Sequence, residues 1–180
     1  MNLAQIIYPD IPGETYARMF SRLLRELTEE SIPGDILEVG IGDGWTHREL
    51  HRHRGHRTVY GVDNFTGVDM CSMAELITDI YGWQSEPHIF VMYSRDVPRH
   101  LVDVRLALLF IDADHDYEAE FADLKSFVPI LVQGGVLAVH DADRPEVERA
   151  IQDVAHGFRD ALVFEPPPGN GQLMWMGVKR

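Results

Sequence analysis

A glycine-rich turn is the first segment of this sequence that could bind a ligand. It reads Glu38-Val39-Gly40-Ile41-Gly42-Asp43-Gly44 and follows an apolar run, residues 36–39, that predicts a β-strand. Glycines adopt positive φ angles and let the backbone approach a ligand closely. The third glycine comes one residue too early for the Gly-x-Gly-x-x-Gly fingerprint, which weighs against NAD. A strand–helix turn without a ligand is the competing interpretation.

An acidic residue, Asp63, ends the next predicted strand, residues 58–62. A carboxylate at this point can accept both hydroxyl protons of a ribose, and dinucleotide folds place such an acid about 20 residues beyond their glycines. Asp63 lies about that far beyond Gly44, although an Asx turn or a cap uses the same residue type. Together with the glycine turn, Asp63 favours a cofactor that contains a nucleoside.

Two acidic clusters follow the most apolar strands of the chain. Asp112-Ala113-Asp114-His115-Asp116 follows residues 106–111, and His140-Asp141-Ala142-Asp143 follows residues 136–139. Adjacent parallel strands lie about 4.8 Å apart, so Asp112 and Asp141 can reach one cation. Oxygen ligands of this kind suit Mg²⁺, Mn²⁺ or Ca²⁺, and His115 lies where a general base could act. Alternatively, these acids cap the helices that follow and remain hydrated.

A segment rich in histidine and arginine, residues 47–57, allows two further interpretations. His47 and His51 share a helix face, as zinc ligands can, but no Glu occupies the catalytic position of a His-Glu-x-x-His helix. A basic helix can also contact nucleic acid, but no aromatic residues alternate with the charges here. The segment therefore predicts a solvated helix face.

The elements that must position these residues alternate between helix and strand. Such alternation predicts a parallel sheet with helices on both faces, and two final strands without a helix between them predict a hairpin at one edge. In the first helix, Tyr16, Phe20 and Leu24 are expected in the core. Helices are predicted at residues 14–30, 44–54, 73–81, 117–131 (ended by Gly134-Gly135) and from Pro145, and strands at 36–39, 58–62, 89–92, 106–111, 136–139, 161–164 and 173–178.

The overall composition is that of an ordinary soluble globular protein. The 180 residues suffice for a single domain, in which residues 1–33 form a helical cap and residues 34–180 form the core. Hydrophobic residues make up 45% and charged residues 25% of the chain. The formal net charge of −13 weighs against a nucleic-acid partner, because binding to phosphates depends on Lys and Arg.

The remaining bulk features concern location and assembly. The one cysteine, Cys71, excludes an intrachain disulfide, and neither a signal peptide nor a membrane span is visible. We therefore expect a cytoplasmic protein without a membrane partner. The proline-rich stretch at residues 166–168 and the N-terminal helix are candidate contact surfaces for a homo-oligomer.

The motifs together resemble the class I S-adenosylmethionine-dependent methyltransferases. An acid before Gly-x-Gly-x-Gly is typical of their first motif, and Tyr60-Gly61-Val62-Asp63 is similar to their second. The segment from Phe110 to Tyr117, with Asp123-Leu124 and residues 134–141, resembles the small subgroup related to macrolide-sugar O-methyltransferases and cephalosporin-hydroxylase-like proteins. This resemblance implies a doubly wound, Rossmann-like α/β fold of three layers, with a seven-stranded, mostly parallel sheet and an antiparallel last strand.

The resemblance also implies roles for individual residues. Glu38, Gly40 and Gly42 would line the S-adenosylmethionine site, Asp63 would hold the ribose, and Ser94-Arg95-Asp96 falls where relatives contact the adenine. The residue matching Asp112 binds Mg²⁺ in the sugar-methylating relatives, and the one matching His115 is the base. An acidic pair usually follows the fifth strand, whereas this chain has His140-Asp141, so an imidazole replaces one oxygen ligand.

The leading hypothesis is therefore metal-assisted O-methylation of a small hydroxylated substrate. Mg²⁺ or another divalent cation would orient and acidify the hydroxyl, and His115 would take its proton. A metal-independent methyltransferase and a catalytically silent binding module with the same fold are the alternatives. A hydroxylase is disfavoured, because no spacing matches an Fe(II) facial triad.

Overall fold

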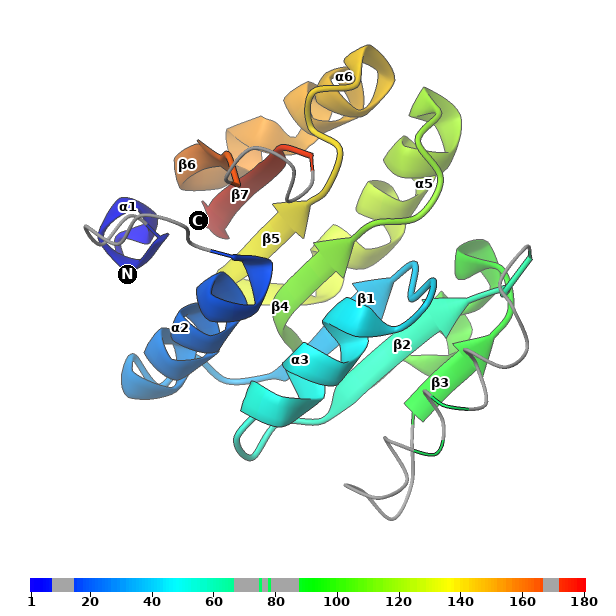
Figure 1. Ribbon diagram of the computed structural model, residues 1–180. Helices are drawn as coiled ribbons and strands as arrows, with labels where there is room; N and C mark the ends of the chain where they lie inside the picture. Colours follow the sequence, from blue (N-terminus) through cyan, green and yellow to red (C-terminus); the bar gives the residue numbers. More distant parts are fainter. Residues whose placement is uncertain (8–14, 67–74, 76–77, 79–87, 167–171) are drawn as a thin grey trace.

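Seven strands form one sheet in a computed structural model that describes residues 1–7, 15–66, 75, 78, 88–166 and 172–180. Their order is β3-β2-β1-β4-β5-β7-β6 (Figure 1). The strand β7 is antiparallel to both of its neighbours, and the pairs among β1 to β5 are parallel. The predicted sheet and edge hairpin are thus confirmed. The strands are β1 (Asp35–Val39), β2 (Val59–Asp63), β3 (His88–Val91), β4 (Leu106–Ile111), β5 (Leu131–Val139), β6 (Phe158–Phe164) and β7 (Met174–Lys179).

Helices cover both faces of the sheet, so the predicted three layers are confirmed (Figure 1). The helices α2 (Tyr16–Glu29) and α3 (Trp45–His53) pack on one face, and α5 (Tyr117–Phe127) and α6 (Pro145–Val154) pack on the other. A short helix, α1 (Leu3–Ile7), lies beside the β6–β7 edge and was not predicted. Pro145 begins α6, where its missing N–H leaves no helical hydrogen bond unmade.

The central strand β4 positions the acidic segment that follows it. All six of its residues are buried, because helices cover both of its faces. Leu108 and Phe110 pack toward α2 and α3, whereas Leu109 and Ile111 pack toward α5 and α6. Burying each such side chain contributes about 1.5–3 kcal/mol. The strand is thereby fixed, and the acidic segment that follows Ile111 is held at the carboxyl edge of the sheet.

The boundary between α5 and β5 differs from the prediction. The helix ends at Phe127, and a short 3₁₀ turn, Val128–Ile130, leads directly into β5. Pro129 lies in that turn and cannot donate the hydrogen bond that a continued α-helix needs. The predicted helix terminators Gly134-Gly135 lie inside β5, next to an irregular register between Leu106 and Leu108. A Cβ atom at Gly135 would lie 3.0 Å from the Ala107 carbonyl oxygen, so a glycine suits this close strand contact.

The predicted helix at residues 73–81 and the predicted turn at 166–171 lie largely outside the described residues. Among the helices that the structure does describe, none has the length and apolar character needed to cross a membrane.

Candidate active site

A cavity of about 900 Å³ opens at the carboxyl edge of the sheet, where β1, β2, β3 and β4 end. Its volume lies within the range of pockets that bind small molecules and cofactors. It lies at the strand ends near the point where the sheet order reverses between β1 and β4, which is where α/β folds bind ligands. Most of the residues singled out from the sequence line this cavity: Gly40, Gly42, Asp63, Ser94, Arg95, Asp112 and His115.

The glycine turn has a backbone that other residues would strain. Gly40, Gly42 and Gly44 have φ angles of 89°, 55° and 80°. A Cβ atom on Gly40 would lie 1.9 Å from the carbonyl oxygen of Asp112, so the turn can pack against the end of β4 only with glycine there. A Cβ on Gly42 would meet nothing within 4 Å, because Gly42 faces open space at the cavity.

Asp63 holds the glycine turn from the neighbouring strand. Its Oδ2 accepts hydrogen bonds from the amides of Ile41 and Gly42, both at 2.8 Å, and its Oδ1 accepts one from Phe65 at 2.6 Å. Each carboxylate oxygen can accept more than one hydrogen bond, so lone pairs remain for a ligand. The predicted ribose acid therefore also orients the backbone of the cofactor turn.

Glu38 does not line the cavity, and it lies behind the glycine turn. It is buried and shares a 2.5 Å hydrogen bond with Nδ1 of His47. Burial, followed by the charges of Asp112, Asp63 and Asp43, raises the pKa of Glu38 well above its ordinary value. His47 is fully buried and His51 is 5% exposed, so the prediction of a solvated face is wrong for both. They face the sheet because Glu38 offers His47 a polar partner there, and His47 in turn offers one to His51.

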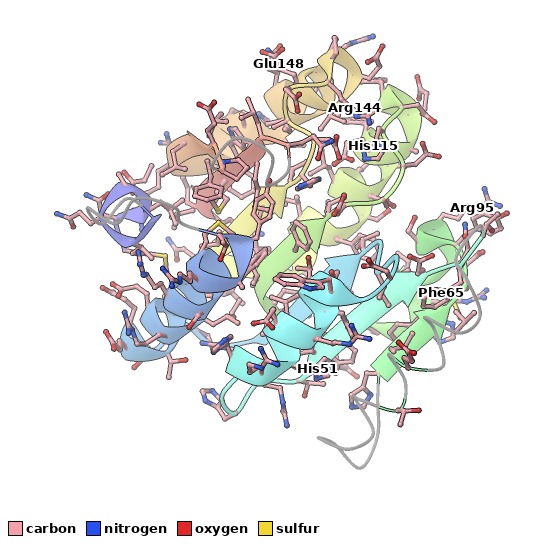
Figure 2. The ribbon with its side chains drawn as sticks, in the orientation of Figure 1. His51, Phe65, Arg95, His115, Arg144 and Glu148 are labelled. Atoms are coloured by element: carbon pink, nitrogen blue, oxygen red, sulfur yellow. The ribbon has the colours of Figure 1, made fainter. Side chains whose placement is uncertain are left out.

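Ser94 and Arg95 follow β3 in a short 3₁₀ turn, Ser94–Asp96. The Arg95 guanidinium lies 4.6 Å from the centre of the Tyr93 ring. The hydroxyl of Ser94 hydrogen-bonds Asp123 of α5 and lowers the pKa of this carboxyl, but burial outweighs it and the pKa is about 6. The predicted adenine segment is thus tied to α5 across the cavity, and Figure 2 shows Arg95 on the β3 side of the molecule.

At the acidic end of the cavity, Asp112 and His115 of its lining lie beside Asp141 and His140, which follow β5 and do not line the cavity themselves. One ligand atom from each of Asp112, His115 and Asp141 lies within 4.8 Å of the other two. Nε2 of His115 lies 2.9 Å from Oδ2 of Asp141, yet without hydrogen-bond angles, so this buried nitrogen has no hydrogen-bond partner among the described residues. Nδ1 of His140 lies 2.9 Å from Oδ2 of Asp141 and 3.2 Å from Oδ1 of Asp112. His140 thus bridges the two carboxylates.

The charges at this end are strongly coupled. Burial lowers the pKa of His140, but hydrogen bonds and charges from Asp112 and Asp141 outweigh it, so the pKa is raised. Burial acts to raise the pKa of Asp141, but the hydrogen bonds from Arg144 and His140 outweigh it and the pKa is lowered. Arg144 Nε donates to Oδ1 of Asp141 at 2.9 Å, and Figure 2 shows Arg144 beside His115. Two carboxylates, an imidazole and an unpartnered nitrogen fit a divalent cation.

Two ionisable residues near this cluster are not singled out as site residues by the sequence, and neither lines the cavity. Tyr16 was expected in the core, and Phe20 and Leu24 are indeed buried there. Tyr16 packs against this core but is only half-buried, with its ring centre 5.4 Å from that of His140 and its hydroxyl donating to the Gln172 carbonyl. Burial, then the charges of Asp112 and Asp141, raise its pKa.

The second missed residue, Glu120, is buried on α5, and its Oε1 has no hydrogen-bond partner among the described residues. Burial, then the charge of Asp123, then that of Asp112, raise the pKa of Glu120 to about 8. Its sequence signal was an acid on the helix face that also carries Asp123, Leu124 and Phe127, all of them buried.

The chain matches the sequence profile of one known protein family. The sequence profile of a methyltransferase-domain family matches residues 37–142, which contain the glycine turn, Asp63 and both acidic clusters. None of the curated protein sequences matches the chain.

Solved structures share this fold. The TDP-rhamnose 3′-O-methyltransferase of calicheamicin biosynthesis is 22% identical, with a TM-score of 0.70 over 91% of this chain and 77% of its own. The O-methyltransferase NovP is 16% identical, with a TM-score of 0.73 over 100% of this chain and 89% of its own. A Bacillus cereus O-methyltransferase, solved with SAH, is 14% identical, with a TM-score of 0.67 over 94% and 84%. The matched structures also include rRNA methylases.

Proposed function

The chain belongs to this methyltransferase-domain family, and on that premise we propose that it transfers the methyl group of S-adenosylmethionine to a hydroxyl of a small molecule. One observation carries the proposal. A single cavity extends from the glycine turn and Asp63 to Asp112 and His115, so a cofactor and a reactive hydroxyl could meet inside it.

The cofactor would occupy the part of the cavity next to β1, β2 and β3. Gly40 lets the turn pack against the end of β4, Gly42 faces the open cavity where a ligand can approach the backbone, and Asp63 retains lone pairs for ribose hydroxyls. Ser94 and Arg95 would contact the base. Glu38 would act on the cofactor through the turn that it supports, because it does not line the cavity itself.

Asp112 and Asp141 would hold a divalent cation, with the imidazole of His140 as a nitrogen ligand, which leaves His115 free to act as the base. Such a cation would orient and acidify an acceptor hydroxyl when bound. Mg²⁺ and Mn²⁺ suit the carboxylate oxygens best. Arg144 would keep Asp141 oriented through its 2.9 Å hydrogen bond.

His115 would take the hydroxyl proton on Nε2, the nitrogen that has no hydrogen-bond partner among the described residues. Asp141 lies 2.9 Å away and would stabilise the imidazolium that results. The acceptor oxygen would then attack the methyl carbon in line as the sulfur–carbon bond breaks, which leaves S-adenosylhomocysteine. Most of the rate acceleration would come from holding the two reactants in this geometry.

A small-molecule acceptor is favoured over a nucleic acid by charge. The chain has a net charge of −13, and carboxylates line the acidic end of the cavity. A polyphosphate chain would be repelled there. Cytoplasmic location is part of the same proposal, since one cysteine in 180 residues fits a reducing compartment.

The test combines binding with turnover. Calorimetry with S-adenosylhomocysteine should show binding, and methyl-labelled S-adenosylmethionine should label hydroxylated acceptors such as nucleotide sugars and phenols, with loss of labelling in EDTA. Labelling that persists in EDTA would support the metal-independent enzyme instead. Labelling of RNA alone would overturn the small-molecule acceptor. Cofactor binding without turnover on any acceptor would favour the silent binding module.

A further inference from the structure

Two buried histidines on α3 face the end of β1 and have no part in the mechanism proposed above. His47 and His51 lie one helical turn apart, and both point toward the sheet rather than toward solvent. Figure 2 shows His51 on α3. Buried imidazoles are costly unless they are hydrogen-bonded, so their partners indicate what they do.

The partners form a chain of hydrogen bonds. Nδ1 of His47 lies 2.5 Å from Oε2 of Glu38, and Nε2 of His47 lies 3.2 Å from Nε2 of His51. Both ring nitrogens of His47 therefore have partners, which fixes the plane of the ring. Burial raises the pKa of Glu38 and lowers the pKa of His47 to about 3. Burial thus disfavours the charged form of both groups, and the contacts from Nδ1 to Glu38 and from Nε2 to His51 satisfy the His47 ring inside the protein.

This hydrogen bond spans the glycine turn. Glu38 lies in β1 just before the turn, and His47 lies in the first turn of the helix that follows it. The two ends of the turn are thus joined by one buried hydrogen bond between side chains. A change in the length or direction of that bond would alter the angle between β1 and α3, and with it the shape of the turn.

A glycine in β2 makes room for the His47 ring. Gly61 pairs with Glu38 in the sheet, and a Cβ atom at Gly61 would lie 2.6 Å from Cε1 of His47 and 2.6 Å from Cδ1 of Ile41. The ring and the Ile41 side chain therefore share the space over Gly61. The amide of Ile41 is one of the two that donate to Asp63. Displacing the ring would consequently move the turn residue that Asp63 holds.

We propose that His47 is a positioning residue of the cofactor site, which holds Glu38 across the glycine turn and keeps Ile41 against Asp63. His51 holds the ring of His47 in place through the contact between their Nε2 atoms. The inference rests on cofactor binding and is independent of which acceptor is methylated.

Calorimetry with S-adenosylhomocysteine tests this role. We expect His47→Leu to weaken the affinity about tenfold, because a buried hydrogen bond at the turn is lost. His47→Asn should restore most of the affinity, since its amide reaches the Nδ1 position. Val178→Ala, a core change in β7 far from the turn, controls for loss of stability, and His56→Leu controls for loss of an exposed histidine.

Nitrogen NMR of the imidazoles supplies a readout that a general loss of stability would not move. In the wild-type chain we expect the neutral His47 ring to give one protonated and one unprotonated nitrogen signal, and both signals should shift when S-adenosylhomocysteine binds. Equal affinities of wild type and His47→Leu, or a matching loss in Val178→Ala at equal melting temperature, would overturn the positioning role alone. Absence of binding by the wild-type chain would overturn the proposed function as well.

Discussion

The candidate site has two halves, one around the glycine turn and one around the acidic cluster, and they accommodate buried polar groups in different ways. In the half beside β1 and β2, the polar groups are satisfied within the protein: Asp63 accepts three backbone amides, and Glu38 is bonded to His47. In the half beside β4 and β5, Asp112 and Asp141 face each other with one histidine between them. Nε2 of His115 there lacks a hydrogen-bond partner within the described residues.

This difference indicates which half is complete before a ligand arrives. The first half is preorganised, because its hydrogen bonds already hold the glycine turn in the shape that a cofactor needs. The second half concentrates negative charge that Arg144, through its hydrogen bond to Asp141, offsets only in part. A bound cation would complete it. Variants in the two halves should therefore fail in different assays.

The largest effect is expected for Asp112→Asn. It keeps the size of the side chain but removes a charge from the proposed cation site, so methyl transfer should fall by about 10²–10³-fold, the equivalent of several kcal/mol. Affinity for S-adenosylhomocysteine should change far less. Initial rates in a Mg²⁺ titration measure the effect, with Asp143→Asn as the exposed control from the same loop as Asp141. A rate equal to wild type would remove Asp112 from the chemistry.

The reverse pattern is expected for Asp63→Ala. This change removes the acceptor for the amides of Ile41 and Gly42 as well as the proposed ribose contact, and hydrogen bonds to a charged group contribute about 1.5–3 kcal/mol each. Affinity for S-adenosylhomocysteine should fall about 10- to 100-fold by calorimetry. Binding of Mn²⁺, followed by electron paramagnetic resonance, should stay unchanged. Loss of Mn²⁺ binding would show that the two halves are not independent.

A smaller effect, on stability, is expected for Glu120→Gln. The pKa of Glu120 is raised to about 8 from 4.5, so the folded chain holds a proton that the unfolded chain has released, and wild-type stability should fall as the pH rises from about 5 to 8. Below pH 4.5 the contribution vanishes, because both states are protonated. The Glu120→Gln variant has no carboxyl here to lose a proton, so its stability should not fall in this way. The difference between its melting temperature and that of wild type should therefore increase in favour of the variant between pH 5.5 and 8.5. The exposed Glu118→Gln should follow the wild-type curve.

The fold was predictable because its signals are local. The apolar runs at β1 and β4, the alternation with helices and the absence of a helix between β6 and β7 each follow from short stretches of sequence. The α5–β5 boundary was not, because two glycines in a row resemble a helix terminator as much as a close contact between strands. Pro129 was the better indicator of where α5 ends, because it lies in the turn that follows the helix.

The sequence predicted the position of those site residues that directly follow a strand. Asp63, Asp112 and Asp141 follow strands, so sheet geometry brings them to one edge. The direction of a helix face was harder to predict. His47 and His51 alternate with Arg48 and Arg52, which makes the segment look solvated until Glu38 is known to face it. Tyr16 reaches the site from an element whose other apolar residues are core, and only tertiary structure shows its contact with His140.

The smallest effect is expected for Tyr16→Phe, which tests where the acceptor half ends. The change keeps the ring beside His140 and removes only the hydrogen bond to the Gln172 carbonyl, a net contribution of about 0.5–1.5 kcal/mol. If the phenol borders the acceptor, KM for the acceptor should rise about two- to tenfold with little change in cofactor affinity. Tyr93→Phe, at the cofactor end, should leave acceptor KM unchanged. Equal changes in both constants for Tyr16→Phe would instead mean that Tyr16 orders the whole edge of the sheet.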